Sequence, residues 1–147
     1  SEGHVRTYIG NWLRKLARGR YAVPQEEELA DAKRPDLRFL GIAFDAPVPV
    51  ELKLADNWSG PKLFERLESQ LCGDYLRDPR STCGVFLLVY RGEQKSWHLP
   101  EAAGAVDFKG LVEALQERWV ALSPSLPTVD DILVIGIDLT RRAAVAT

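Results

Sequence analysis

Apolar residues recur at every third or fourth position in three stretches of the chain, a spacing typical of helices that bury one face. The first stretch is followed by Gly19, a common helix stop, and the second starts after Ser59 and ends before Asp78-Pro79. We therefore expect helices over about residues 2–18, 61–76 and 108–122.

Shorter runs between these helices predict strands. The run at residues 85–90 is apolar throughout, as in a strand buried on both faces. Because the helix at 61–76 joins two strands, we expect those strands to be parallel, with a right-handed crossover between them. The predicted strands cover about residues 21–29, 36–43, 48–55, 85–90 and 132–137.

The order of elements is helix, three strands, helix, strand, helix, strand, which predicts a layered α/β fold. With 147 residues, 46% of them hydrophobic, residues 1–147 suffice for one domain with its own core. The chain contains no methionine, so we expect a domain excised from a larger multidomain protein. No run reaches membrane-spanning length, and no secretion signal is present, which predicts a cytoplasmic protein. Cys72 and Cys83 lack companions at metal-ligand spacing, so we expect reduced packing residues.

The predicted strand at 48–55 carries the candidate chemistry. Side chains alternate along a strand, so Glu51 and Lys53 share one face and Leu52 points to the other. If Asp36 lies alongside on the neighbouring strand, two carboxylates and an ammonium converge, and carboxylate oxygens suit a hard divalent cation. Such a set of residues is typical of a site that cleaves phosphodiesters.

The position of the hairpin turn bears on this pairing. Residues opposite each other in a hairpin are equidistant from its turn, and the midpoint between Asp36 and Glu51 or Lys53 falls at about Phe44-Asp45. Asp45-Ala46-Pro47 is a turn-forming sequence. The turn is therefore expected where the site requires it.

Pro35-Asp36 followed by Glu51-Leu52-Lys53 resembles the signature of the PD-(D/E)xK nuclease superfamily, also called restriction-endonuclease-like. The resemblance implies a mixed β-sheet flanked by helices on both faces, complete by about residue 90, with the last helix and strand peripheral. It also implies a Mg²⁺-dependent endonuclease, active with Mn²⁺ as well, in which Asp36, Glu51 and the backbone carbonyl of Leu52 bind the ion. Lys53 would orient or deprotonate the attacking water, or stabilise charge on the phosphate. The alternative explanation is an ordinary solvated strand face with an ion pair.

Members of this superfamily often add an acid from the first helix. Glu2 is the only acidic residue in that predicted helix, although a glutamate near the positive end of a helix dipole explains it equally well. Glu26, in the run Glu26-Glu27-Glu28, is the competing candidate, although such a run is usually a solvated face.

The predicted helix at 61–76 supplies candidates for substrate binding. Lys62, Arg66 and Gln70 recur at i+4 and form a polar ridge. In the RecB-like branch of the superfamily, a glutamine on this helix followed by a tyrosine supports the site and contacts the substrate. Gln70 and Tyr75 match this pair, with Tyr75 one position later than usual. A solvated helix edge for Gln70 and a core position for Tyr75 are the structural alternatives.

Two further residues lie close in sequence to the candidate site. Arg34 precedes Pro35-Asp36 and could bind a phosphate as a bidentate fork or neutralise Asp36. Trp58 follows the strand at 48–55 and could stack on a base, although packing within its loop is the simpler explanation.

The net charge of −2 provides no overall basic surface for nucleic acid. Residues 1–80 are neutral, so a bound divalent cation would make that half positive. We expect a nucleic acid as the partner, with DNA favoured over RNA by the resemblance, together with other domains of the parent chain and a homodimer of the kind many relatives form. The alternative function is a catalytically inactive nuclease fold that serves as a docking or nucleic-acid-binding module. The charge favours this alternative, whereas the presence of Asp36, Glu51 and Lys53 opposes it.

Overall fold

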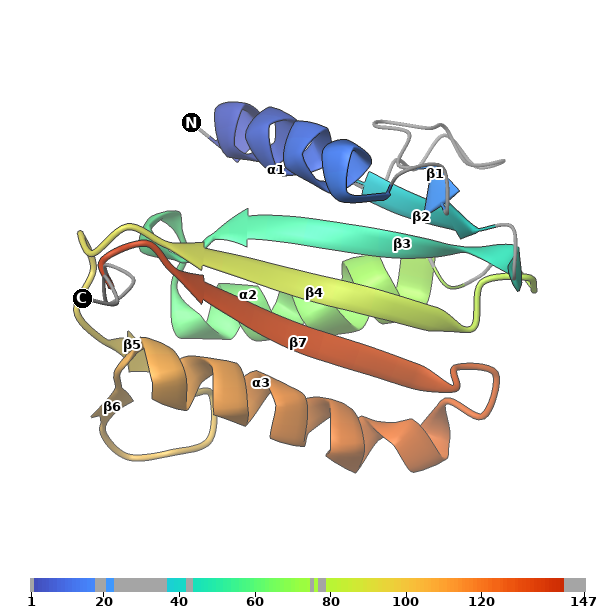
Figure 1. Ribbon diagram of the computed structural model, residues 1–147. Helices are drawn as coiled ribbons and strands as arrows, with labels where there is room; N and C mark the ends of the chain where they lie inside the picture. Colours follow the sequence, from blue (N-terminus) through green and yellow to red (C-terminus); the bar gives the residue numbers. More distant parts are fainter. Residues whose placement is uncertain are drawn as a thin grey trace, which may run out of the picture.

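The computed structural model describes residues 2–17, 21–22, 37–41, 44–74, 76 and 79–141. These residues form a mixed β-sheet with helices on both faces (Figure 1). In chain order the elements are α1 (Glu2–Ala17), β1 (Tyr21–Ala22), β2 (Leu37–Gly41), β3 (Phe44–Leu54), the 3₁₀ turn η1 (Ala55–Asn57), α2 (Gly60–Arg66), the π-helical η2 (Leu67–Asp74), β4 (Cys83–Tyr90), β5 (Trp97–His98), β6 (Ala105–Val106), α3 (Phe108–Leu122), the 3₁₀ turn η4 (Ser123–Ser125) and β7 (Asp131–Asp138).

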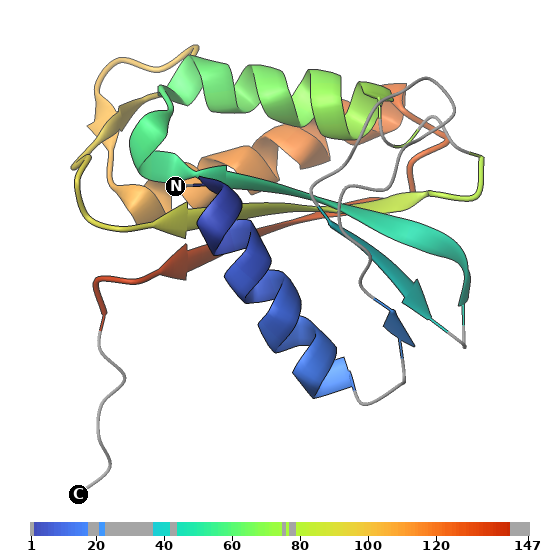
Figure 2. The same cartoon turned by 90° about the horizontal axis from the view of Figure 1, so that it is seen from above.

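The main sheet has the strand order β1-β2-β3-β4-β7. β1, β2 and β3 are antiparallel neighbours, whereas β3, β4 and β7 run parallel to one another. The parallel pair predicted across the second helix is therefore confirmed. α1 lies on one face of the sheet, and α2 and α3 lie on the other (Figure 2). β5 and β6 form a separate two-stranded ribbon that the sequence pattern did not predict.

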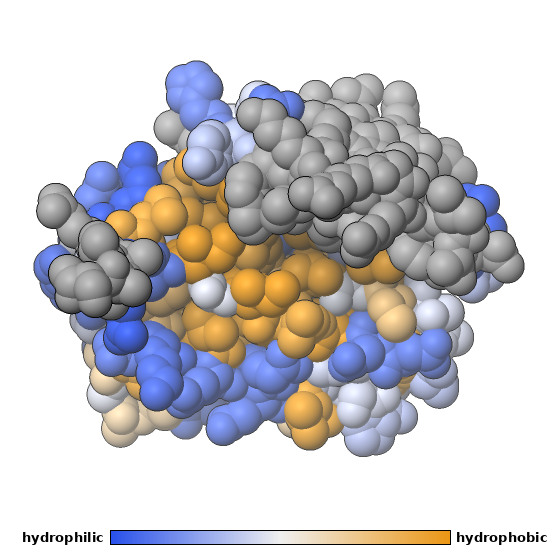
Figure 3. All heavy atoms as spheres, viewed as in Figure 1, coloured by the Kyte–Doolittle hydropathy of each residue, from blue (hydrophilic) through white to orange (hydrophobic). Residues whose placement is uncertain are grey.

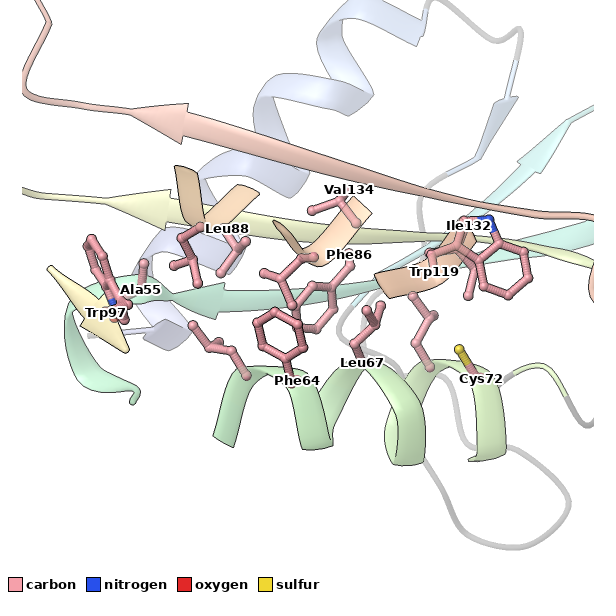
Figure 4. Close-up of a cluster of buried hydrophobic side chains, with 14 of the residues drawn as sticks. Ala55, Phe64, Leu67, Cys72, Phe86, Leu88, Trp97, Trp119, Ile132 and Val134 are labelled. Atoms are coloured by element: carbon pink, nitrogen blue, oxygen red, sulfur yellow. The ribbon is translucent and has the colours of Figure 1, made fainter. Parts of the chain in front are cut away.

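Alternating side chains of the central strands divide the interior into two cores. The core on the α1 side joins β3 to β4 and packs against Val5 and Ile9 of α1. The larger core lies between the sheet and the helices α2, η2 and α3 (Figure 4). The buried members of the smaller core are Val50, Leu52, Leu54, Leu87 and Val89.

The last helix and strand belong to the larger core. Leu111, Leu115 and Trp119 of α3 are buried together with Ile132 of β7, and β7 pairs with β4 along the whole length of both strands. The expectation that this part of the chain is peripheral was wrong. The reason is physical, because the apolar stripe of α3 is needed to cover the side of β4 that carries Phe86.

The hairpin turn lies earlier than the sequence indicated. Asp45-Ala46-Pro47 is part of β3, and the chain reverses between Gly41 and Phe44, which are paired. A register shift between Phe39 and Gly41 accompanies this earlier reversal. Proline is tolerated in this part of β3 because β4 pairs with β3 only from Val50 onward, so the ladder on that side has not yet begun.

The helix after β3 starts as predicted and changes character along its length. The Ser59 hydroxyl accepts a hydrogen bond from the Lys62 backbone N–H at 3.4 Å, which caps α2. α2 gives way to the wider η2, which ends at Asp74, slightly before the predicted end at Leu76. The predicted apolar stripe is nevertheless confirmed, since Leu63, Leu67 and Leu71 are all buried.

β7 is buried on one face only. Leu133 and Ile135 lie on the same side of the sheet as α1 and are 51% and 37% exposed. Figure 3 shows hydrophobic side chains gathered on this side of the molecule. The apolar run at 132–137 therefore forms a strand, but an edge strand with one solvent-facing side.

Both cysteines are free thiols, as expected. Cys72 lies in the larger core, where burial raises the pKa of its thiol to about 11, with a further contribution from the negative charge of Glu68. Cys72 thus behaves as a packing residue.

The turn that follows β3 is held by Trp97 of β5. The buried indole Nε1–H of Trp97 donates hydrogen bonds to the carbonyl oxygens of Ala55 at 3.2 Å and Trp58 at 3.1 Å. The neighbouring residue His98 approaches Gly60 so closely that a Cβ atom on Gly60 would lie 1.8 Å from the His98 carbonyl oxygen. The path of the chain from β3 into α2 is therefore fixed by contacts with β5.

We expect Trp97→Phe to lower the free energy of unfolding by about 1–3 kcal/mol, because the carbonyl oxygens of Ala55 and Trp58 both lose the buried indole N–H donor. Urea denaturation followed by circular dichroism measures this loss. Trp119→Phe is the matched control, since Trp119 donates to Asp131 Oδ1 at 3.1 Å and Asp131 is exposed, so water can replace the donor. Equal losses in the two variants would contradict the role assigned to Trp97.

Candidate active site

Glu51 and Lys53 lie side by side on the face of β3 that looks toward α2 and η2. Lys53 Nζ is 2.5 Å from Glu51 Oε1, and the two residues are only 6% and 2% exposed. Their partners in β4, Phe86 and Leu88, point into the larger core on the same face. The predicted sharing of one face is confirmed. The alternative of a solvated strand face is wrong, because both charged groups are buried.

Trp58 is a second neighbour of the Lys53 ammonium. Lys53 Nζ lies 4.8 Å from the centroid of the Trp58 ring, and the guanidinium carbon of Arg66 lies 5.5 Å from the same centroid. Both distances are within the range of cation–π attraction. Trp58 is therefore a packed loop aromatic, as the simpler explanation held, and its ring lies against two cations and the larger core.

The polar ridge on α2 and η2 divides into an outer and an inner part. Lys62 is 62% exposed and its ammonium lies 3.6 Å from the Glu65 carboxylate. Arg66 and Gln70 are half-buried, and Arg66 Nε and Gln70 Oε1 are buried atoms without a hydrogen-bond partner among the residues that the structure describes. Arg66 and Gln70 thus retain hydrogen-bonding capacity near the sheet, whereas Lys62 faces solvent.

Several predicted site residues lie outside the described residues, namely Asp36, Arg34, Glu26 and Tyr75, together with the side chain of Glu2. The described pairing of β2 with β3 ends with Leu37 opposite Val50, the residue before Glu51. Within the described ranges, no group of three or more histidine, cysteine, aspartate or glutamate side chains could hold a metal ion. Glu51 is the predicted carboxylate ligand whose surroundings the structure shows.

Asp56 is a structurally important residue that the sequence pattern did not single out. It follows β3, and its carboxylate accepts hydrogen bonds from the backbone N–H groups of Arg91 at 2.7 Å, Glu93 at 2.7 Å and Gln94 at 3.1 Å. Burial acts to raise the pKa of Asp56, but these backbone hydrogen bonds outweigh it and hold the pKa below its usual value. Asp56-Asn57 is a turn-type sequence, yet nothing local could reveal a partner segment beyond β4.

A hollow among the described residues lies elsewhere, at the start of α3 and the end of β7. It has a volume of about 420 Å³ and includes Phe108 and Gly136 in its lining. Four of the charged groups around it form ion pairs, since Lys109 Nζ lies 4.0 Å from Glu113 Oε1 and Arg141 Nε lies 3.4 Å from Asp138 Oδ2. This hollow is separate from the Glu51–Lys53 pair.

Comparison of the chain with protein-family models, curated proteins and solved structures finds no match. In the part of the chain that the structure describes, none of the helices combines the length and apolar character needed to cross a bilayer.

We expect Asp56→Asn to lower the free energy of unfolding at neutral pH. A carboxylate whose pKa is lowered by folding adds stability above its unfolded-state pKa, and this stability is lost as the pH falls through its folded-state pKa. The difference in free energy of unfolding between wild type and variant should therefore become smaller as the pH is lowered from neutral to about pH 3. Urea denaturation measures this difference. Asp130→Asn, at an exposed position, serves as the control. A difference in free energy of unfolding that stays constant with pH would contradict the lowered pKa assigned to Asp56.

Proposed function

We propose that this protein is a metal-dependent nuclease with a restriction-endonuclease-like core, which hydrolyses phosphodiester bonds in DNA in preference to RNA. Asp36, Glu51 and Lys53 form its active site. The observation that carries this proposal is the burial of the Glu51–Lys53 pair on a central strand of the sheet.

A buried ion pair adds little net stability to a fold, because both charges lose their hydration. Each charge loses several kcal/mol of hydration, and apolar residues of similar size often give equal or better stability. The face of the sheet that carries Glu51 and Lys53 is otherwise apolar at Phe86 and Leu88. Charged groups retained at such a position favour a role in chemistry over a role in stability.

The strand register supports the addition of Asp36. Leu37 lies opposite Val50, and the antiparallel register carried one residue further would set position 36 against Glu51. This is the arrangement that the proposed site requires. The proposed pairing would depend on the register near Glu51 and not on the position of the turn, so the earlier reversal at Gly41 does not contradict it.

The proposed ligands fit Mg²⁺ or Mn²⁺, because the carboxylates of Asp36 and Glu51 and the carbonyl of Leu52 are all oxygen donors. A carboxylate can accept several hydrogen bonds or ligand contacts, so Glu51 can serve Lys53 and a cation together. When bound, the ion supplies Lewis acidity toward phosphoryl oxygens and acidifies water.

The chain's own groups would orient the reactants. Lys53 Nζ has three N–H donors, and the contact with Glu51 Oε1 leaves donors for the attacking water or for a non-bridging phosphate oxygen. Arg66 and Gln70 would contact the nucleic-acid backbone from the helix side, with the capacity left at Arg66 Nε and Gln70 Oε1 among the described residues. Arg34, Lys62 and Tyr75 are proposed as further substrate contacts.

Lys53→Ala and Glu51→Gln should each reduce cleavage of plasmid and single-stranded DNA by at least about 100-fold, because each removes a group at the reacting centre. The assay contains Mg²⁺ or Mn²⁺, and a parallel reaction with RNA measures the preference for DNA. Lys109→Ala is the matched control, since Lys109 is 78% exposed and away from the pair. Nucleic-acid binding without cleavage in the wild-type protein would instead indicate an inactive docking or binding module.

Glu51→Gln and Asp36→Asn should each weaken Mn²⁺ binding by more than about tenfold, since each replaces an anionic ligand with a neutral one. Isothermal titration calorimetry without nucleic acid measures this affinity. Asp130→Asn provides the control for loss of a negative charge at an exposed position. Unchanged affinity in both site variants would rule out the proposed ligand set.

A further inference from the structure

Trp58 contacts two cations of the candidate site, Lys53 and Arg66, with one ring. Its indole lies near the Lys53 ammonium and the Arg66 guanidinium at 4.8 Å and 5.5 Å from the ring centroid. Lys53 comes from β3 and Arg66 from α2, so the ring links the strand that carries the charged pair to the helix that flanks it. A loop aromatic that served only as filler would not need two cationic neighbours from different elements.

We infer that Trp58 is a positioning residue, which holds the Lys53 ammonium and the Arg66 guanidinium in place for reaction. Its catalytic consequence rests on the proposed nuclease function, whereas its structural content does not. A lysine side chain is a flexible stem with a compact charge, and its position depends on the partners at its end. Lys53 has the Glu51 carboxylate as one partner and the Trp58 ring as another.

The second partner matters because Glu51 is also a proposed metal ligand. A carboxylate that shares its charge with a divalent cation attracts an ammonium less strongly. The face of an indole ring attracts the ammonium through its quadrupole and does not use a carboxylate oxygen to do so. Trp58 therefore keeps Lys53 near Glu51 when the carboxylate charge is shared.

The backbone that carries Trp58 is itself fixed. The Trp58 carbonyl oxygen accepts a hydrogen bond from Trp97 Nε1–H at 3.1 Å, and the same indole N–H donates to the Ala55 carbonyl oxygen at 3.2 Å. Asp56, between these residues, binds the backbone after β4. The ring is thus presented from a turn with several anchors, which is the property a positioning residue needs.

Arg66 gains orientation from the same contact. The guanidinium carbon lies over the Trp58 ring, and Arg66 Nε is a buried atom that has no hydrogen-bond partner within the described ranges. A guanidinium held over an aromatic ring retains N–H groups for acceptors such as phosphate oxygens. Trp58 therefore holds the Arg66 guanidinium beside the site.

The test of position uses nuclear magnetic resonance on protein labelled with ¹³C-lysine, without metal or nucleic acid. We expect the Lys53 Hε signals, assigned with Lys53→Arg, to be shifted upfield by the indole ring in the wild type. The shift should be reduced in Trp58→Phe and abolished in Trp58→Leu, while the signals of exposed Lys62 and Lys109 stay unchanged. Trp58→Met provides a second ringless variant if Trp58→Leu does not fold. A Lys53 signal that is the same in wild-type and ringless proteins overturns the inference.

The catalytic consequence is measured by steady-state cleavage of an oligonucleotide. We expect kcat to fall by about tenfold in Trp58→Leu through Lys53, with a rise in KM through Arg66 and with partial recovery of both in Trp58→Phe. An unchanged kcat, with or without a raised KM, would show that Trp58 does not position Lys53 for reaction, and would overturn the inference. If the wild-type protein cleaves nothing while the Lys53 signals respond as expected, the nuclease proposal fails and the positioning of Lys53 by Trp58 stands.

Discussion

A buried contact between a carboxylate and an ammonium, at Glu51 and Lys53, is the interaction on which the candidate site depends. Both charges are withdrawn from water in the middle of a mostly apolar sheet, so each must find its compensation within the protein. The 2.5 Å contact between the two groups supplies part of it, and the Trp58 ring supplies another part on the lysine side. Leu52, between them, points into the opposite core, which fixes the strand in one register and so holds the two charges on the helix side.

The scaffold around this contact is built from segments distant in sequence. The parallel pairing of β3 with β4 sets the plane of the site, and the segment that follows β4 then returns to the end of β3. There Asp56 accepts backbone hydrogen bonds from residues 91, 93 and 94, and Trp97 donates to the turn at residues 55–58. Residues with little regular structure of their own thus hold the turn that carries Trp58. The helix start at Gly60 is pressed against the same segment, which explains why no side chain fits there.

The sequence predicted the helices, the strands of the main sheet and the alternation along β3, because these follow from local periodicity, but it did not predict the ribbon of β5 and β6. The helix at residues 108–122 matches the observed α3, and the first helix ends within one residue of its predicted end. The prediction of a turn at Asp45-Ala46-Pro47 was wrong, because turn propensity cannot reveal the register shift between Phe39 and Gly41. Within the site, the shared face of Glu51 and Lys53 was predictable, whereas their burial and the contacts of Trp58 were not. Those features depend on the packing of α2 and on the return of Trp97, which are tertiary effects.

The local charge around the site can explain how an acidic chain would bind the proposed polyanionic substrate. Lys53 and Arg66 bring two positive charges to the Trp58 ring, and Glu51 offsets one of them, so these residues together are weakly positive. The proposed carboxylate of Asp36 would cancel that excess, and a bound divalent ion would restore and enlarge it. Attraction for a phosphate backbone would then appear mainly when the ion is present, and added salt would weaken it. In the proposed arrangement the same ion would govern both substrate affinity and chemistry, which would allow a protein with net charge −2 to act on nucleic acid without a broad basic surface.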